Sequence, residues 1–558
     1  MKKLVNLFPV LLLVLACSEP QTFDVLIKNG QVVDGSGETS YIGSVGINVD
    51  TIAAVGNLKN AVGKTEIDAK GLTLAPGFIN MLSWATESLL IDGTSESDIR
   101  QGVTLEVMGE GWSMGPLNAK MKAESLASQK DYKYEIDWTT LGEYLQSLEN
   151  RGISCNVASF VGATTLRIHE LESENRPPTP EELDRMKALA RTAMEEGAMG
   201  IGSSLIYAPA FYAGTEELIE LCKVASEYGG MYISHLRSEG DYWLEAIDEL
   251  IRIAAEANIP AEIYHLKAGG KDNWGKWEAA IAKIDSARSA GLKITTDMYT
   301  YTAGATGLDA SMPPWVQEGG YGEWAKRLQD SAIRKKVAQE MRAKGEGWEN
   351  LYFAAGSPEK LLLNGFRNDT LRYLTGKTLG EVAKMRGTSP EETAMDLVVQ
   401  DSSRVGTVYF LMSEENVKKQ IALPYMSFGS DAASIAPVVP FTNYNPHPRA
   451  YGNFSRLLGK YVREEQIIPL EEAVRKLSAL PASNLKLKKR GMIKVGNYAD
   501  LALFDATTIL DKATFEEPHQ FAKGMVHVFV NGTQVLKDGE HTGATPGRFI
   551  KGPGFKEN

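Results

Sequence analysis

The feature that most constrains the fold is a regular alternation of short apolar runs with longer amphipathic segments through the middle of the chain. The apolar runs read as strands, at Ser154–Phe160, Gly200–Ser204, Met231–His235, Ala261–His265 and Lys293–Tyr299. The amphipathic segments read as helices, at Pro180–Glu196, Thr215–Tyr228, Tyr242–Ala257 and Trp274–Ala290. Such alternation favours a parallel sheet, and about eight units over roughly 400 residues predict a (β/α)8 barrel over 79–488. The less regular stretch near 311–375, interrupted by Pro and Gly, is expected to be an insertion.

The two ends of the chain differ from this middle. Residues 24–78 and 489–540 are rich in short apolar strands cut by turn dipeptides such as Asn29-Gly30 and Asn531-Gly532. This pattern predicts one small β-sandwich assembled from both termini, followed by a tail at 541–558.

The first residues resemble an export signal. Lys2 and Lys3 precede an apolar run, and Val14-Leu15-Ala16-Cys17 follows it. The pattern is similar to a bacterial lipobox, so we expect a signal peptide at 1–16, lipidation of Cys17 and a polar tether at 17–23; the alternative is a plain signal peptide with an incidental cysteine. Ser18 after the cysteine favours an exported lipoprotein on the periplasmic side of the outer membrane or at the cell surface.

The charge balance narrows the range of partners. The net charge is −12, and the chain has no block rich in Lys and Arg. Nucleic acid is therefore not an expected partner. Outside the N-terminus, no apolar run approaches the ~20 residues of a membrane-spanning helix, so membrane contact is expected through the lipid anchor only.

Histidine is scarce, with seven in the chain, so its placement is informative. His235 and His265 each end a predicted strand, and Asp431 ends a later apolar run in the same way. Barrel enzymes carry their sites where strands meet the following loops. A single histidine at a strand end can be structural, but two on adjacent strands with a later acid predict a shared site.

Several segments in order along the chain resemble the D-aminoacylase (N-acyl-D-amino-acid deacylase) branch of the metal-dependent amidohydrolases. They are Pro76-Gly77-Phe78-Ile79-Asn80, Ser234-His235-Leu236-Arg237 with Glu239, Tyr264-His265-Leu266-Lys267, Asp297-Met298-Tyr299-Thr300-Tyr301, Gly429-Ser430-Asp431, Asn445-Pro446-His447-Pro448-Arg449-Ala450-Tyr451-Gly452 and Gly491-Met492-Ile493-Lys494-Val495-Gly496-Asn497-Tyr498-Ala499-Asp500-Leu501. The resemblance runs from about Asp24 to Phe529. It implies a zinc bound by His235, His265 and a second-strand cysteine, with Asp431 as the catalytic acid and base. It also implies a weaker second metal position built on a first-strand His-x-His.

The sequence departs from that branch at two places. Leu82 and Trp84 occupy the positions of the first-strand His-x-His, and neither side chain can bind zinc. The second-strand cysteine is also missing, because an ungapped match places Gly111 opposite it. Glu110 lies one residue earlier, and two His with one carboxylate form a known catalytic zinc set. We therefore expect one zinc per chain, held by Glu110, His235 and His265; the alternative is a solvated Glu110 and an empty pocket.

The expected chemistry is zinc-assisted hydrolysis of an N-acyl-D-amino acid, with Asp431 taking the proton of the attacking water and passing it to the leaving amine. A substrate of this kind carries a free carboxylate, for which Lys267 and Arg449 are the candidate cations. Tyr299, Tyr207 and His447 could add hydrogen bonds. D over L preference follows from the resemblance alone.

Two other hypotheses fit the same residues. The lost ligands favour a catalytically inactive amidohydrolase fold kept as a binding lipoprotein. The second hypothesis is an active amidohydrolase whose substrate is a D-dipeptide or a cyclic amide.

Overall fold

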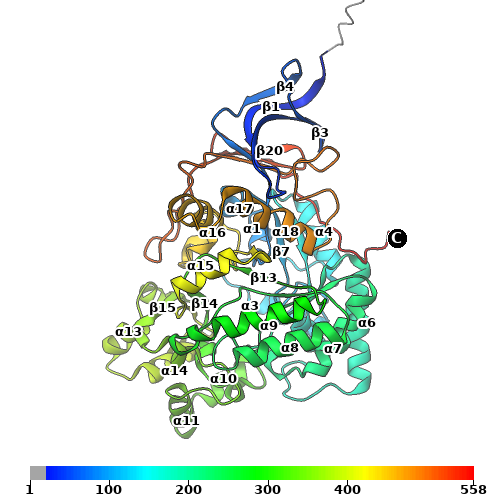
Figure 1. Ribbon diagram of the computed structural model, residues 1–558. Helices are drawn as coiled ribbons and strands as arrows, with labels where there is room; N and C mark the ends of the chain where they lie inside the picture. The colour runs from blue at the N-terminus through cyan, green and yellow to red at the C-terminus, as the bar shows by residue number, and fades with distance from the viewer. Residues whose placement is uncertain (1–19, 558) are drawn as a thin grey trace, which may run out of the picture.

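The computed structural model describes residues 20–557. The predicted signal peptide and Cys17 lie outside the described residues. A terminal sheet occupies one end of the molecule, and the alternating strands and helices of the middle of the chain lie beneath it (Figure 1). Across residues 20–557, every helix is too short or too polar to cross a membrane.

The middle of the chain forms two parallel sheets. Their strands are β6 (Phe78–Asn80), β7 (Val103–Met108) and β8 (Asn156–Ser159) in one sheet, and β9 (Val161–Gly162), β10 (Gly200–Ser204), β11 (Met231–His235), β12 (Ala261–Ile263), β13 (Ile294–Met298) and β17 (Met426–Phe428) in the other. Only Phe160 separates β8 from β9, and on the other side Met81 N–H donates to the Phe428 carbonyl at 3.1 Å. A parallel bridge between Ser83 and Ala432 extends this second junction. The two sheets therefore adjoin along both edges, as the predicted barrel requires.

Helices follow the strands where the amphipathic segments predict them. The helices after β9 to β12 are α5 (Ala163–Leu171) and α6 (Pro180–Glu196), α7 (Thr215–Glu227), α8 (Trp243–Glu256) and α9 (Trp277–Ser289). The sequence fixes the ends of α6 in a local way. Thr179 and Glu182 form a capping box around Pro180 at the first helical position, and Gly197 ends the helix at φ +109°.

Shorter helices complete the region around the parallel sheets. These are α1 (Ser88–Ile91), α2 (Glu96–Ile99), α3 (Ala119–Ser128), α4 (Leu141–Arg151), α15 (Glu414–Ala422), α16 (Arg449–Arg456), α17 (Leu470–Leu477) and α18 (Ala479–Asn484).

Both ends of the chain enter one nine-stranded sheet. Its strands are β1 (Thr22–Val32), β2 (Tyr41–Asn48), β3 (Thr51–Gly56), β4 (Val62–Asp68), β5 (Thr73–Pro76), β18 (Leu501–Phe504), β19 (Met525–Val530), β20 (Thr533–Lys537) and β21 (Glu540–His541). Both termini contribute strands, as predicted. The strands form one continuous hydrogen-bonded sheet, however, and not the two separate sheets of the predicted β-sandwich. The reason is β5, which pairs with β1 on one edge and with β18 on the other.

The insertion is longer and more ordered than the predicted 311–375. It begins at β14 (Ala303–Gly307), which forms a three-stranded antiparallel sheet with β15 (Leu361–Gly365) and β16 (Gly406–Phe410). Its helices are α10 (Tyr321–Arg327), α11 (Ser331–Met341), α12 (Leu351–Ala355), α13 (Leu379–Arg386) and α14 (Pro390–Asp401). The Pro and Gly breaks that make 311–375 look irregular lie between these short elements.

The expected tail is bound to the parallel strands. Gly547 N–H donates to the Ile153 carbonyl at 2.7 Å, and Val157 N–H donates to the Arg548 carbonyl at 3.0 Å. Ile153 and Val157 lie before and early in β8, so the tail covers the amino-terminal side of the parallel strands, near α4 and α6 (Figure 1).

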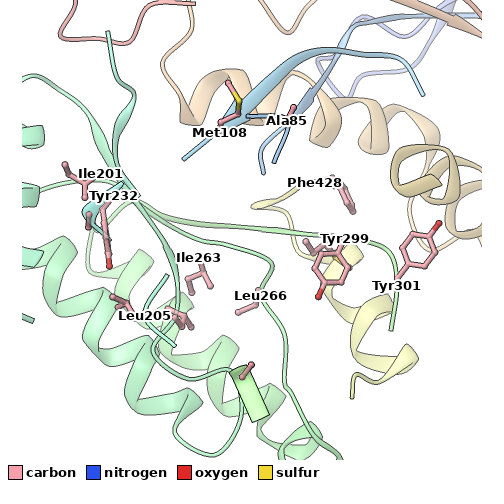
Figure 2. Close-up of a cluster of buried hydrophobic side chains, with 14 of the residues drawn as sticks. Ala85, Met108, Ile201, Leu205, Tyr232, Ile263, Leu266, Tyr299, Tyr301 and Phe428 are labelled. Carbon is pink, nitrogen blue, oxygen red and sulfur yellow. The ribbon is translucent and has the colours of Figure 1, made fainter. Parts of the chain in front are cut away.

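The core joins the parallel strands to the helices outside them. Figure 2 shows buried side chains of one cluster on several strands, among them Met108 of β7, Ile201 of β10, Tyr232 of β11, Ile263 of β12 and Phe428 of β17. Each of these five side chains is at most 1 % exposed. Their burial fixes the strands, and the strands in turn position the residues at their carboxyl ends.

Candidate metal centre

Two glycines direct Glu110 into the centre. Gly109 and Gly111 have φ values of +107° and +71°, a region that L side chains rarely adopt. A Cβ on Gly109 would lie 2.3 Å from the Phe160 carbonyl oxygen, and one on Gly111 would lie 2.2 Å from Ser204 Oγ. The backbone after β7 therefore accepts a side chain at Glu110 and at neither neighbour, so the side chain that enters the cluster lies one residue before the position matched to the cysteine.

His235 and His265 lie at the ends of adjacent strands. His235 is the last residue of β11, and His265 follows β12 by two residues with φ +34°. The strand ends earlier than predicted because its backbone turns at His265. Asp297 stabilises this turn, since its Oδ1 accepts the His265 N–H at 2.8 Å.

Glu110 and the two imidazoles form one cluster. Glu110 Oε1 lies 3.0 Å from His235 Nδ1 and 3.1 Å from His265 Nε2. One ligand atom from each of the three buried residues lies within 4.8 Å of the others. Burial alone would raise the pKa of Glu110, but the two imidazoles lower it to about 2. A carboxylate with two imidazoles is a donor set that zinc accepts, so these residues fit the predicted ion.

Trp84 connects the cluster to Asp431. The indole N–H donates to Glu110 Oε2 at 3.0 Å and to Asp431 Oδ1 at 3.1 Å. Backbone hydrogen bonds hold this segment to two other segments. The backbone N–H of Ser83 donates to the Val107 carbonyl, and the backbone N–H of Trp84 donates to the Ala432 carbonyl. The residue that replaces a first-strand histidine therefore lies inside the site and contacts two of its carboxylates.

Glu239 and Lys267 lie behind the imidazoles. Glu239 Oε1 is 2.9 Å from His265 Nδ1 and 2.6 Å from Lys267 Nζ, and its other oxygen is 3.6 Å from His235 Nε2. Burial opposes ionisation of Glu239, but His235, Lys267 and His265 together lower its pKa well below the ordinary value. Sequence reasoning assigned no role to Glu239; its signal was the spacing of four residues after His235 at the same strand end.

Asp431 is paired with Arg449. Arg449 Nη2 lies 2.9 Å from Asp431 Oδ2, and the guanidinium is stacked 4.4 Å from the centre of the Tyr299 ring. Burial raises the pKa of Asp431, against the opposing charge of Arg449. The Nε and Nη1 atoms of Arg449 are buried and have no hydrogen-bond partner among the described residues. The side chain therefore keeps donors free to bind an anion.

His447 differs from its expected role. Its Nε2 donates to the Ala303 carbonyl at 2.9 Å, and its Nδ1 accepts the Arg449 N–H at 3.0 Å. Burial, together with Arg449, lowers its pKa well below the ordinary value. Both ring nitrogens are used by the backbone, so the expectation that His447 offers a hydrogen bond to a substrate is corrected. His447 links the Arg449 segment to the first strand of the insertion.

The predicted site residues line one cavity of about 710 Å³. They are Glu110, Tyr207, His235, His265, Lys267, Tyr299, Asp431, His447 and Arg449. Tyr207 packs edge-on against His235, with ring centres 5.3 Å apart. The insertion contributes part of the wall, including Thr306 and Arg404. The cavity size and mixed lining are those of a small-molecule site.

Comparison with known proteins agrees with this geometry. The amidohydrolase family matches residues 65–536. A D-aminoacylase of Alcaligenes xylosoxydans xylosoxydans is 33% identical over 96% of this chain and 98% of its own length.

Two solved structures are also similar. An N-acyl-D-glutamate deacylase of Bordetella bronchiseptica, complexed with zinc and a phosphonate inhibitor, is 27% identical with a TM-score of 0.78, over 95% of this chain and all of its own. The other is a D-aminoacylase with a binuclear metal centre, for which one-metal activation and second-metal attenuation are described. It is 32% identical with a TM-score of 0.78, over 95% of this chain and all of its own. This chain therefore belongs to the amidohydrolase family, in its D-aminoacylase branch.

Proposed function

We propose that this chain is a mononuclear zinc hydrolase that releases a D-amino acid from its N-acyl derivative. The observation that carries the proposal is the convergence of Glu110, His235 and His265, whose ligand atoms lie within 4.8 Å of one another. The parallel strands occupy eight positions when β8 and β9, separated by Phe160 alone, are counted as one. Because the two parallel sheets adjoin along both edges, these strands would form a closed (β/α)8 barrel.

The residues of the centre divide the work of hydrolysis. Zinc, when bound, would act as a Lewis acid toward the acyl carbonyl and the attacking water. Asp431 takes a proton from the water as it attacks the acyl carbon. It then gives that proton to the amine as the C–N bond breaks, so that a carboxylic acid and a D-amino acid leave. The raised pKa of Asp431 suits this double role, because such a group can both accept and return a proton.

The free carboxylate of the substrate would bind to Arg449. Lys267, the other predicted cation, is already engaged by Glu239 and by His265 Nδ1 at 2.6 and 2.7 Å. Within residues 20–557, the Nε and Nη1 atoms of Arg449 have no hydrogen-bond partner, and a guanidinium can bind a carboxylate through two parallel hydrogen bonds. Tyr299 lies between the two cations, 5.6 Å from Lys267 Nζ and 4.4 Å from the Arg449 guanidinium carbon, measured from its ring centre.

The relatives support the substrate class. One is named for D-aminoacylase activity, and another for deacylation of N-acyl-D-glutamate. We propose the same class for this chain, and we retain export and lipidation at Cys17 as part of the proposal on the strength of the sequence pattern alone.

The test uses purified protein lacking residues 1–17. Zinc content per chain is measured first, and hydrolysis of a panel of N-acetyl-D-amino acids, their L enantiomers and a cyclic imide is then followed. About one zinc and D-selective hydrolysis support the proposal. Zinc with turnover of the cyclic imide alone would replace the linear substrate class, and no zinc after incubation with the metal would leave a binding protein.

A further inference from the structure

We propose that the Trp84 indole occupies the place of a second metal ion and thereby fixes the metal count of this centre at one. This inference rests on the proposed zinc site, but it concerns the number of ions that the site binds. Trp84 is the residue that sets this number.

The first argument is the position of the indole N–H. It lies between two carboxylates of the centre, 3.0 Å from Glu110 Oε2 and 3.1 Å from Asp431 Oδ1. A second ion in a hydrolytic centre would need oxygen or nitrogen ligands of its own, and carboxylate oxygens are ligands that zinc accepts. Here, the indole hydrogen occupies the space between two such oxygens.

The second argument concerns charge and space. Zinc binds carboxylate oxygens at about 2.0–2.2 Å, closer than any N–H···O contact between heavy atoms. An ion that bound both oxygens would have to share them with the indole hydrogen, whose partial positive charge repels a cation. The Trp84 ring also lines the cavity directly, so the indole and a hydrated ion compete for the same region.

The third argument is that the indole cannot easily move away. The backbone N–H of Trp84 donates to the Ala432 carbonyl at 2.9 Å, and the backbone N–H of Asp431 donates to the Leu82 carbonyl at 2.8 Å. These bonds tie the segment after β6 to the segment after β17, which carries Asp431. Leu82, the other former ligand position, is 1 % exposed and packs against Gly429, so it offers no ligand either.

The arrangement also supplies what a second ion would supply electrostatically. Two carboxylates that face each other repel, and a shared N–H donor offsets part of that repulsion. Trp84 therefore lets Glu110 and Asp431 stay close without a second cation.

The experiment compares four proteins by zinc content and by calorimetric titration with excess zinc. They are the wild type, Leu82→His, Trp84→His and the double variant Leu82→His/Trp84→His. We expect about one zinc in the wild type and still about one in Leu82→His, because the indole remains in place. We expect a second, weaker binding step in Trp84→His and about two zinc ions in the double variant.

Each outcome is decisive. A second zinc bound by Leu82→His alone would show that Trp84 does not exclude it, and two zinc ions in the wild type would overturn the inference while leaving the hydrolase proposal intact. No zinc in the wild type would remove the proposed function itself. If the Trp84 variants do not fold, the titration of the wild type and of Leu82→His decides the question, since both retain the indole and a second binding step in either contradicts the inference.

Discussion

Glu239 Oε1 lies 2.9 Å from His265 Nδ1, on the nitrogen opposite the one that faces Glu110. Lys267 Nζ lies 2.7 Å from the same Nδ1, so the carboxylate and the ammonium together fix the edge of the imidazole that faces away from Glu110. The same carboxylate holds Lys267. One acid therefore sets the orientation of an imidazole and the position of a cation.

Glu239→Gln is expected to weaken zinc binding about 10- to 100-fold, because the amide cannot hold both His265 and Lys267 as the carboxylate does. Competition with a chelator measures the affinity. Glu245→Gln, at an exposed acid of α8, is the matched control and should leave it unchanged. Equal affinity in Glu239→Gln and the control would contradict the role of Glu239.

Asp431→Asn is expected to lower kcat about 10²- to 10⁴-fold with zinc content unchanged, because the amide cannot take the proton of water. The Asn carbonyl can still accept the Trp84 N–H, so the site should keep its shape. Steady-state kinetics with metal analysis on the same sample provide the measurement. Full activity in this variant would end the assignment of Asp431.

Arg449→Met is expected to remove the preference for a free carboxylate. The wild type should hydrolyse an N-acyl-D-amino acid far better than its carboxamide, because the free guanidinium donors bind the anion. In the variant, kcat/KM for the acid should fall toward that for the carboxamide. Because Arg449 also pairs with Asp431, the ratio of the two substrates is the informative quantity, and an unchanged ratio would assign the carboxylate to another residue.

Gly111→Ala is expected to destabilise the fold by more than Gly356→Ala. Both glycines have φ near +75°, at +71° and +77°, so both substitutions carry the backbone cost of about 1–2 kcal/mol. A Cβ on Gly111 additionally meets Ser204 Oγ at 2.2 Å, whereas one on Gly356 meets no atom within 4 Å. Urea unfolding of the two variants isolates the steric part. Gly111→Cys should likewise fail to restore a thiolate ligand, because the same clash applies.

Lys476 makes stability depend on pH in the alkaline range. The Lys476 side chain, in α17, is fully buried and donates to the Ile421 and Leu423 carbonyls. Burial lowers the pKa of Lys476 from 10.5 to about 8, although the negative charge of Glu472 opposes this shift. Between these values the unfolded chain binds the proton and the folded chain does not. The contribution to stability therefore rises with pH, by up to about 3 kcal/mol across the window.

Lys476→Met should remove that rise. Unfolding in urea at pH 7.5 and 9.5 gives the slope for the wild type, for Lys476→Met and for Lys335→Met at an exposed position of α11. The slope should be smaller in Lys476→Met alone. The same slope in all three proteins would show that Lys476 keeps its proton in the fold.

Much of this structure follows from local patterns in the sequence. The span Pro180–Glu196 agrees with its helix to the residue because a capping box and a terminal glycine mark its ends. The strand Met231–His235 was equally well bounded, since its apolar run stops where the site begins. The cluster of Glu110, His235 and His265 could be predicted because all three lie at the carboxyl ends of parallel strands.

Other features depend on contacts that no local pattern encodes. The positions of Glu239 and Trp84 depend on side chains that meet across the site, and Trp84 meets Asp431, which lies 347 residues further along the chain. The occupied nitrogens of His447 depend on Ala303, a residue of the insertion. The extent of that insertion was underestimated because β14 pairs with β16 across about one hundred residues.

The pairing of β5 with β18 has a consequence for how the molecule is made. Pro76 lies opposite Leu501, so one edge of the first-synthesised strands stays open until almost all of the chain has emerged. During that interval, the newborn protein exposes a row of backbone donors and acceptors that can pair with another copy. Synthesis speed, or a chaperone that covers β5, would then govern the yield of folded enzyme.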